Sequence, residues 1–376
     1  MKLGVDLSIL DELLPLGPRY EYRGEEVEPF AFFASHSGIS MTRLRLWVDP
    51  YDEQGNPYGG GTNDLPAFIR LAKKAIAAGM EVLLDFHYSD FWVDPSRQIP
   101  PKAWRGKPFA EVVRLLYEYT RDTLMAIRDE GIDLAAIQVG NEITQGMLYP
   151  YGEIWAKDPQ EGGGYDGLCE LLKAGFRACK EIFPHAKRVC HLEHSGSNDM
   201  QDPYFENLLE RGVEFEVIGE SYYPYWHGTF DQFEDNVRKL KAKYGKEIWV
   251  VEAGYEYAES RLSNHHQDFL DADPELFRPG NLNGRVPFPL TQQGQADYFR
   301  YFLALCKRIG VGMVFYWEPA WVYVPDQGWA KEAGQVYCGL EPGHADNDWE
   351  NETLFDFEGR ATLAVDVFTQ DFVDSL

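Results

Sequence analysis

The chain has 376 residues, 44% of them hydrophobic, which is enough for one large domain or two domains of ordinary size. Its 61 acidic residues outnumber its 35 basic residues, so the formal net charge is −26. This negative charge repels nucleic acid, anionic membrane surfaces and polyanionic substrates, so a neutral ligand is expected. No segment approaches the roughly 18 consecutive apolar residues that a membrane span requires.

Short β-branched runs that end near Gly, Pro, Asn or Asp recur along the chain and predict eight strands. In chain order they are Lys2–Asp6, Met41–Leu46, Glu81–Phe86, Ala135–Val139, Arg188–His191, Val217–Ser221, Ile248–Val251 and Met313–Trp317. Amphipathic stretches of helical period lie between them, for example Leu65–Ala78 and Phe109–Glu130, and Gly79 and Gly310 mark helix ends. Eight alternating units predict a parallel sheet closed into a (β/α)8 TIM barrel. No composition break interrupts the chain, so a single domain over residues 1–376 with long βα loops is predicted.

The beginning of the chain and its cysteines bear on cofactors and location. The segment Met1–Asp6 starts a strand pattern at once, without the charged and apolar regions of a signal peptide. This predicts a cytoplasmic protein if the chain is complete, or a secreted one whose leader has been removed. The five cysteines are odd in number and form no CxxC pair, and the His and Asp residues lack HxH spacing. We therefore predict no disulfide framework, no metal and no cofactor.

Polar and aromatic residues stand where the predicted strands end, and barrels of this kind carry their active sites at that rim. Glu142 follows the fourth strand and Glu252 follows the seventh, across the barrel from each other. Glycoside hydrolysis needs such a pair, one carboxyl to protonate the leaving oxygen and one anion to face the developing oxocarbenium centre. Arg45, His87 and His191 are expected to set the pKa values of the two carboxyl groups apart.

Five segments carry a family resemblance. They read RLRLWVDP at 43–50, LDFHYSDFWVDP at 84–95, QVGNEI at 138–143, SYYPYWHG at 221–228 and FYWEPAW at 315–321. An Asn-Glu pair after the fourth strand and a Glu after the seventh resemble the clan A glycoside hydrolases, which are retaining enzymes on this barrel. The whole set, in this order, resembles the endo-β-1,4-galactanases of glycoside hydrolase family 53.

The resemblance implies hydrolysis of neutral β-1,4-linked galactan or galacto-oligosaccharides. Glu142 would be the acid/base and Glu252 the nucleophile, with carboxyl groups about 5–5.5 Å apart. Asn141 would hold the sugar 2-hydroxyl, and Arg45 together with Tyr222, a tyrosine of the sixth strand, would steady Glu252.

A chain of β-1,4-galactose is curved, and this curvature predicts a cleft whose stacking rings are set at an angle. Trp92, Trp226 and Trp317 lie in loops that can supply such rings, while Asp90 and His191 are expected to bond sugar hydroxyls. A site built to bond one hydroxyl rejects the wrong epimer, because its buried polar groups are left unpaired.

The chain departs from the family pattern in places. Glu220 stands where the family usually has an apolar residue, and 193–199 differs from the family's run after the fifth strand. The runs 264–268 and 271–273 lack the DxDxHxN-like spacing with which some bacterial relatives bind calcium, so no calcium site is predicted. The alternatives are another clan A glycosidase (a β-mannanase, xylanase or β-galactosidase), a barrel that only binds glycans, or a metal-dependent barrel hydrolase.

Overall fold

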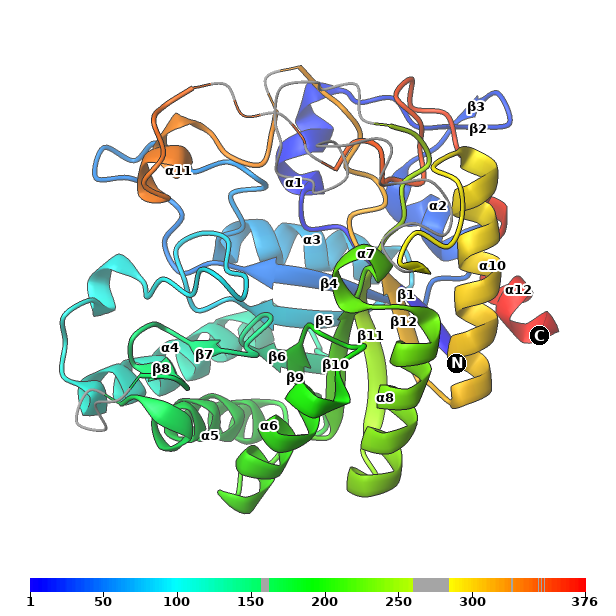
Figure 1. Ribbon diagram of the computed structural model, residues 1–376. Helices are drawn as coiled ribbons and strands as arrows, with labels where there is room; N and C mark the ends of the chain where they lie inside the picture. The colour runs from blue at the N-terminus through cyan, green and yellow to red at the C-terminus, as the bar shows by residue number, and fades with distance from the viewer. Residues whose placement is uncertain (157–161, 260–283, 326, 344, 346, 348) are drawn as a thin grey trace.

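The computed structural model describes residues 1–156, 162–259, 284–325, 327–343, 345, 347 and 349–376 (Figure 1). Its centre is a closed parallel barrel in the order β1-β12-β11-β10-β9-β6-β5-β4, which confirms the predicted (β/α)8 fold. The barrel strands are β1 (Lys2–Asp6), β4 (Met41–Leu46), β5 (Glu81–Phe86), β6 (Ala136–Val139), β9 (Lys187–Leu192), β10 (Val217–Tyr222), β11 (Glu247–Ala253) and β12 (Met313–Tyr316).

Helices surround the barrel on its outer side (Figure 1). The longer ones are α3 (Leu65–Ala77), α4 (Phe109–Asp129), α5 (Gly164–Ile182), α6 (Asn198–Glu210), α8 (Phe230–Tyr244) and α10 (Gln292–Ile309). Shorter elements lie in the loops and near the chain ends: α1 (Leu10–Leu13), η1 (Leu14–Leu16), β2 (Glu21–Tyr22), β3 (Glu25–Glu26), α2 (Pro29–Ser35), η2 (Lys102–Trp104), β7 (Gly146–Met147), β8 (Gly152–Glu153), α7 (Pro224–His227), α11 (Glu332–Tyr337), η4 (Leu363–Asp366) and α12 (Gln370–Ser375). Among the described helices, none has the length and apolar character needed to cross a bilayer.

Local sequence signals explain where several helices begin and end. The Asp64 side chain accepts a hydrogen bond from the Ala67 N–H at the start of α3, and Thr229 and Gln232 form a capping box on α8. At the other end of α10, Gly310 has φ 78°, a left-handed conformation that costs glycine little. The helix ends predicted at Gly79 and Gly310 are confirmed.

The barrel interior is built in layers by alternate residues of the strands. The layer nearer the N-terminal ends is apolar and consists of Met41, Leu83, Ala136, Val189, Val217, Trp249, Val251, Met313 and Phe315. Two positions further along four of these strands come Arg43, Asp85, Gln138 and His191, all buried. Residues i and i+2 of a strand face the same side, so the apolar layer is the floor on which these polar side chains stand.

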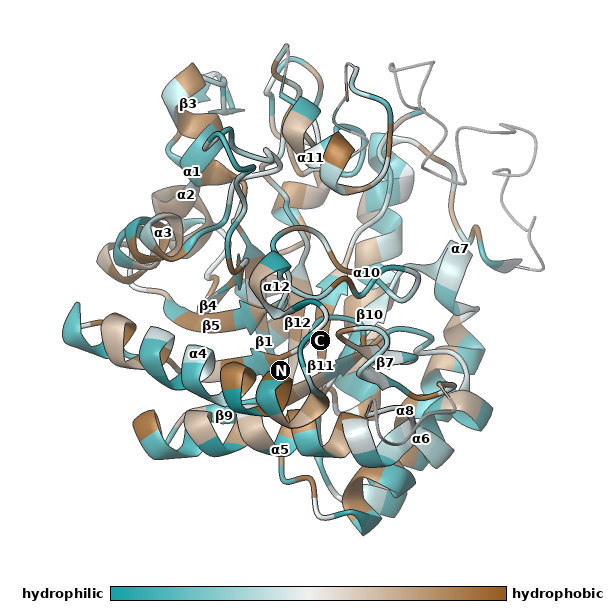
Figure 2. Cartoon of the chain, turned by 90° about the vertical axis from the view of Figure 1, so that its left-hand side faces the viewer, coloured by the Kyte–Doolittle hydropathy of each residue, from teal (hydrophilic) through white to brown (hydrophobic). Residues whose placement is uncertain are grey.

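The outer faces of the strands pack against the helices in a second, larger core. Hydrophobic residues are concentrated on the strands and on parts of the helices, whose other sides are hydrophilic (Figure 2). In α4 the buried positions Val112, Leu116, Thr120, Leu124 and Ile127 recur at helical spacing and form the inward face.

One carboxyl group lies in this outer layer. Glu220 is fully buried on the outer side of β10, between Ile218 and Tyr222 of the helix-facing core. Its Oε2 accepts a hydrogen bond of 2.7 Å from Gln201 Nε2 of α6, whereas Oε1 has no hydrogen-bond partner. Burial raises the pKa of Glu220 well above its ordinary value, the Gln201 bond opposes this, and the charge of Glu193 adds to it.

Replacing this carboxyl by an amide is expected to stabilise the protein at neutral pH. The pKa of Glu220 in the folded protein lies above its unfolded value of about 4.3. The free energy of unfolding therefore falls as the pH rises from the unfolded pKa to the folded pKa. Glu220→Gln keeps the shape and an acceptor for Gln201, so we expect the free energy of unfolding to rise by about 1–3 kcal/mol at pH 7. At pH 4 the variant and the parent should be nearly equal. Denaturant unfolding at both pH values measures this, and a loss of stability at pH 7 would contradict it.

Candidate active site

Glu142 and Glu252 meet at the C-terminal rim of the barrel. Glu142 follows β6, and Glu252 lies near the end of β11. Three atoms lie within 4.8 Å of one another: a carboxylate oxygen of Glu142, a carboxylate oxygen of Glu252 and a ring nitrogen of His191. Retaining glycosidases place their carboxyl groups about 5–5.5 Å apart, whereas inverting enzymes need about 6.5–9.5 Å. The spacing here is therefore that of a retaining pair.

The backbone at both positions departs from regular geometry. Glu142 has φ 49°, in the left-handed region that non-glycine residues avoid at a cost of about 1–3 kcal/mol. Between β10 and β11, Glu220 is opposite Val250 but Ser221 is opposite Glu252, so the register shifts by one residue at Val251. In regular alternation Val251 and Glu252 would face opposite sides of the sheet. The shift allows Val251 to remain in the interior core while Glu252 faces the site.

Ser221 and His191 hold the Glu142 carboxyl. Ser221 Oγ donates to Glu142 Oε1 at 2.7 Å, and it lies 2.8 Å from His191 Nε2. Since the serine hydrogen is given to Glu142, the histidine carries its proton on Nε2. His191 Nδ1 then accepts from Gln138 Nε2 at 3.1 Å, and burial lowers the pKa of His191 well below its ordinary value. The imidazole is neutral, and its tautomer is set by its neighbours.

The two carboxyl groups have different electrostatic surroundings. Burial raises the pKa of Glu142 well above its ordinary value, and the charge of Glu252 is the next contribution. Burial also raises the pKa of Glu252, to about 7, but the guanidinium of Arg43 opposes this from 2.9 Å. Tyr223 Oη donates to the other oxygen of Glu252 at 3.4 Å. Glu142 therefore holds a proton more tightly than Glu252 does.

Arg43 is the residue that connects the site. Its side chain is 1% exposed, and its guanidinium contacts five groups from four segments of the chain. The partners are Asp6 (3.0 Å), Asp85 (2.8 Å), Gln138 (3.2 Å), Asn141 (2.7 Å) and Glu252 (2.9 Å). Carboxylates on three sides favour the charged guanidinium, which in turn favours the charged form of Glu252.

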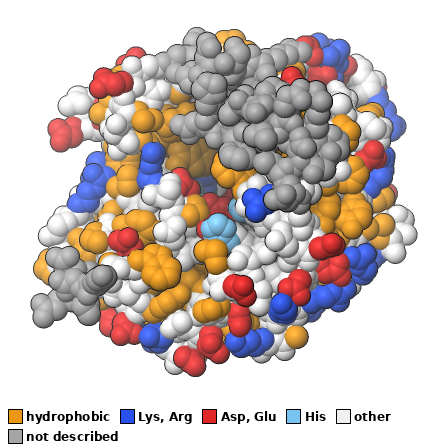
Figure 3. All heavy atoms as spheres, in the orientation of Figure 1, with side chains coloured by type: hydrophobic (Ala, Val, Ile, Leu, Met, Phe, Trp, Pro, Cys, Tyr) orange, Lys and Arg blue, Asp and Glu red, His pale blue; other side chains and the backbone are white. Residues whose placement is uncertain are grey.

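The rim that carries these groups is hollowed. The space-filling view shows a depression lined by hydrophobic side chains, with a histidine and acidic side chains at its edge (Figure 3). A depression that is apolar along its walls and carries a few convergent polar groups is the usual form of a small-molecule or glycan site.

Comparison with known proteins identifies the family. Residues 2–368 match Glycosyl hydrolase family 53. The chain belongs to this family. It is 33% identical to the endo-beta-1,4-galactanase of Bacillus subtilis (strain 168) over 387 residues, covering 97% of this chain and 84% of that protein. It is also 33% identical to an uncharacterized protein of Niallia circulans over 361 residues, covering 95% and 90%.

Solved structures agree with this assignment. The catalytic domain of the family 53 protein from Ignisphaera aggregans superposes with a TM-score of 0.85 at 35% identity, covering 98% of this chain and 95% of that one. A structure from work on two fungal beta-1,4-galactanases superposes on this chain with a TM-score of 0.75. The two chains are 26% identical, and the match covers 98% of each.

In this family 53 chain two supporting roles predicted from the sequence belong to other residues. Arg45 does not reach Glu252: it contacts Glu318 and the Gly60 carbonyl. The contact with Glu252 is made by Arg43, two positions earlier on the same face of β4. Tyr222 is fully buried on the helix side and donates to the Gly228 carbonyl at 3.0 Å, so its predicted contact with Glu252 is wrong. Its neighbour Tyr223 makes that contact instead.

Asp90, which the sequence predicts to bond sugar hydroxyls, is enclosed by the protein. Its side chain is fully buried, and Oδ2 accepts a hydrogen bond of 2.7 Å from the Lys102 N–H. Asp90 therefore anchors the loop after β5 through Oδ2, whereas its Oδ1 has no hydrogen-bond partner in the described structure, and its contact with sugar stays a prediction.

The remaining predicted residues lie around the same rim. His87 is buried, with Nε2 3.0 Å from Asp85 Oδ2, and Trp47 Nε1 donates to its Nδ1 at 3.2 Å. Burial lowers the pKa of His87, so the ring is neutral. Asn141 accepts from Arg43 through Oδ1 and donates to the Val93 carbonyl at 3.1 Å.

The three predicted tryptophans differ in exposure. Trp317 is 8% exposed, and Trp226 of α7 is 47% exposed. Trp92 is partly buried and donates to the Trp329 carbonyl at 2.9 Å. The Arg45 guanidinium lies 4.2 Å from the centroid of the Trp92 ring, a cation–π contact that fixes this ring.

Within the described residues, Glu142, His191 and Glu252 also form a group whose ligand atoms are close enough to share a metal ion. The positive Arg43 guanidinium already contacts Glu252, and the His191 Nε2 proton points to Ser221. A metal cation in this place would be repelled by the Arg43 guanidinium. It would also have to displace the proton on His191 Nε2. The arrangement suits a pair of catalytic carboxyl groups better. The predicted absence of a calcium site at 264–268 and 271–273 concerns residues outside the described part of the chain.

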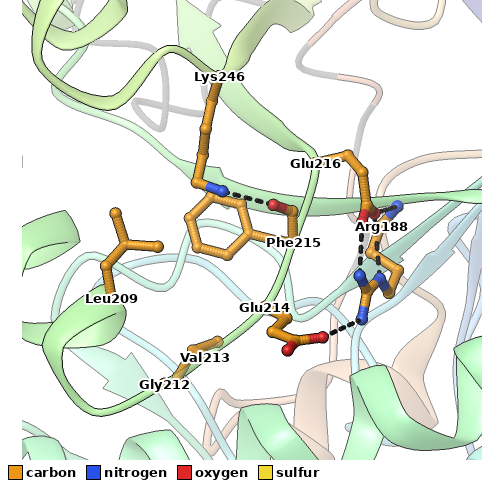
Figure 4. Close-up of a pocket in the computed structure, with 8 residues that line it drawn as sticks. All are labelled: Arg188, Leu209, Gly212, Val213, Glu214, Phe215, Glu216 and Lys246. Atoms are coloured by element: carbon orange, nitrogen blue, oxygen red, sulfur yellow. Dashed lines mark hydrogen bonds and ion pairs between the residues drawn. The ribbon is translucent and has the colours of Figure 1, made fainter.

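A second concave region, whose lining residues are shown in Figure 4, lies at the N-terminal ends of barrel strands and thus opposite the rim that carries Glu142 and Glu252. This open groove of about 460 Å³ is formed where β9, β10 and β11 begin. Its charges satisfy one another, since Arg188 pairs with Glu214 and Glu216, and Lys246 Nζ donates to the Phe215 carbonyl at 2.6 Å. No unpaired polar group there is directed toward a ligand in the described structure.

The two arginines of β4 can be separated by experiment. In Arg43→Lys the compact ammonium cannot hold five partners, so Glu252 is less favoured as an anion. We expect kcat/KM on the substrate to fall by about 10²-fold or more and its acid limb to move to higher pH. Arg45→Lys is the matched control and should leave the acid limb in place, whatever its effect on stability. Profiles of kcat/KM against pH measure both, and an acid limb that moves only in the Arg45 variant would restore the role predicted for Arg45.

Proposed function

We propose that this chain hydrolyses β-1,4-galactosidic bonds in galactan and in galacto-oligosaccharides, with retention of configuration. Membership in glycosyl hydrolase family 53 and the endo-beta-1,4-galactanase relatives support the reaction and its substrate class. The observation that carries the assignment of residues is the pair Glu142 and Glu252, with carboxylate oxygens within 4.8 Å and unlike surroundings. Glu142 is the acid/base in this proposal, and Glu252 is the nucleophile.

In the first step Glu142 gives its proton to the glycosidic oxygen, and the leaving sugar departs as an alcohol. An oxygen of Glu252 forms a bond to the anomeric carbon from the opposite face, which gives an α-linked glycosyl ester. Arg43 keeps Glu252 ionised and aimed before the attack. Because Glu142 binds its proton more tightly, the resting pair holds its single proton on the correct carboxyl.

In the second step a water molecule attacks the anomeric carbon, and Glu142, now a carboxylate, takes the proton of that water. The bond to Glu252 breaks, and its carboxylate returns to Arg43. Once Glu252 is esterified its negative charge is gone, so Glu142 loses the like charge that raised its pKa. The same residue therefore acts as acid in one step and as base in the next, and two inversions give retention.

The aromatic residues of the rim support a curved glycan as substrate. The ring planes of Trp92 and Trp317 meet at 51° with centroids 6.1 Å apart. Rings set at such an angle suit a chain that turns from one sugar to the next. The net charge of −26 also favours a neutral polysaccharide.

Azide rescue separates the two catalytic roles. In Glu252→Ala the covalent step is lost, and azide entering the vacated space should attack an activated aryl β-galactoside to give the α-galactosyl azide. In Glu142→Ala the ester still forms from such a substrate, so azide should give the β-galactosyl azide. Each variant should lose several orders of magnitude in rate on galactan, at least about 10³-fold. NMR of the azide products identifies the anomers, and exchanged anomers would reverse the assignment.

The substrate is tested on a panel of pure polysaccharides. We expect activity on unbranched β-1,4-galactan to exceed that on mannan, xylan or cellulose by about 10²-fold or more, because the axial 4-hydroxyl distinguishes galactose. Reducing-end release measures the rates. Comparable rates on mannan and galactan would reject the galactan assignment while leaving the carboxyl pair intact.

A further inference from the structure

A third carboxyl group is enclosed in the wall of the site. Glu193 follows β9 and is 3% exposed. Its Oε2 accepts a hydrogen bond of 2.7 Å from Thr144 Oγ1, whereas Oε1 is buried without a hydrogen-bond partner. The nearest cation-forming group is the His194 ring, whose Nε2 lies 3.4 Å from Oε1. Among the described residues, no Lys or Arg forms an ion pair with this carboxyl.

The contacts of Glu193 lead directly to the proposed acid/base. Thr144 is two residues after Glu142, and the Ile143 N–H between them donates to the His191 carbonyl at 3.1 Å. The loops after β6 and β9 are thus joined by a main-chain bond and by the Thr144–Glu193 side-chain bond. Glu142 and Glu193 are held on the same wall in a buried setting, where like charges interact strongly.

Several titratable groups surround Glu193. They are Glu142 and Tyr149 from the loop after β6, Asp94 from the loop after β5, Tyr204 from α6, Glu220 from β10, and His194 beside it in the chain. Burial lowers the pKa of His194, so this ring does not supply a lasting positive charge near neutral pH. The negative charge of Glu193 is therefore uncompensated when the carboxyl is ionised.

We propose that Glu193 is a positioning residue that keeps the proton on Glu142 until the glycosidic bond is cleaved. The inference rests on the proposed function, since it assumes that Glu142 is the acid. Burial raises the pKa of Glu193 to about 7, with the Thr144 bond opposing this. As pH rises through neutrality, Glu193 becomes charged and makes it harder for Glu142 to ionise. The pair extends the acid-competent form of the enzyme to higher pH.

The test is the alkaline limb of kcat/KM. Glu193→Gln removes the charge and keeps the size and an acceptor for Thr144, so the pKa of Glu142 should fall. We expect the alkaline limb to move to lower pH by about one unit, with the acid limb unchanged. Thr144→Val removes the bond that favours ionised Glu193, so less Glu193 is charged at a given pH and the pKa of Glu142 should fall. The alkaline limb should therefore also move to lower pH, but by less than in Glu193→Gln.

Glu220→Gln is the matched control. Glu220 is also a fully buried carboxyl, and Gln201 Nε2 donates both to its Oε2 and to the Glu193 carbonyl. Its side chain, however, lies on the helix side of β10 and not on the wall of the site. The control should leave both limbs where they are. An alkaline limb that moves equally in the Glu220 and Glu193 variants, or in neither, would overturn the proposal.

A measurement without turnover separates this inference from the proposed function. The carboxyl carbon of Glu142 can be titrated by NMR in protein labelled at the glutamate δ-carbon, with Glu142→Gln providing the assignment. We expect its midpoint to fall by about one unit in Glu193→Gln and to stay constant in Glu220→Gln. If galactan is not cleaved but the midpoint moves, the proposed function fails and the coupling stands. If galactan is cleaved and the midpoint does not move, Glu193 has no such role.

Discussion

The contact between Arg43 and Glu252 is the interaction on which the rest of the site depends. Burying a guanidinium costs several kcal/mol unless its donors are matched, and here Asp6, Asp85, Gln138 and Glu252 match them from separate strands. These partners come together only when the barrel is closed. Fold and chemistry are therefore coupled: the closed barrel creates the low-dielectric position in which the charge of Arg43 favours the ionised form of Glu252, the proposed nucleophile.

The same burial that makes Arg43 effective raises the pKa of Glu142 and of Glu252. Among the described residues, Glu142 pairs with no cation and its carboxyl accepts a hydrogen bond from the Ser221 hydroxyl, whereas Glu252 has the guanidinium. Two chemically identical side chains thereby acquire opposite states from their neighbours. The left-handed backbone at Glu142 and the register shift before Glu252 are the structural cost of aiming both groups at one bond.

The sequence was sufficient for the barrel and its rim, because strand runs, helix stops and strand-end motifs are local signals. The sequence could not show whether Arg43 or Arg45 contacts Glu252, because both lie on the same face of β4 and differ only by two positions along the strand. It assigned Tyr222 where Tyr223 is correct, because Tyr222 continues the helix-facing side of β10 and only the next residue, beyond the strand, turns toward the site. The bond of Asp90 to the Lys102 N–H could not be predicted either, because it depends on a loop fold that no spacing reveals.

The departures from the family pattern acquire a physical meaning in this setting. Glu193 and Glu220 are buried carboxyls that form no ion pair with a Lys or Arg in the described structure, and both are costly to ionise at neutral pH. They share Gln201, so they belong to one polar network that runs from the helix layer to the wall of the site. A network of this kind costs stability at neutral pH, and an apolar core would avoid that cost. Among the described contacts, the Glu193 end is joined through Thr144 to the loop that carries Glu142, the proposed acid, and this is where a functional gain can accompany the cost in stability.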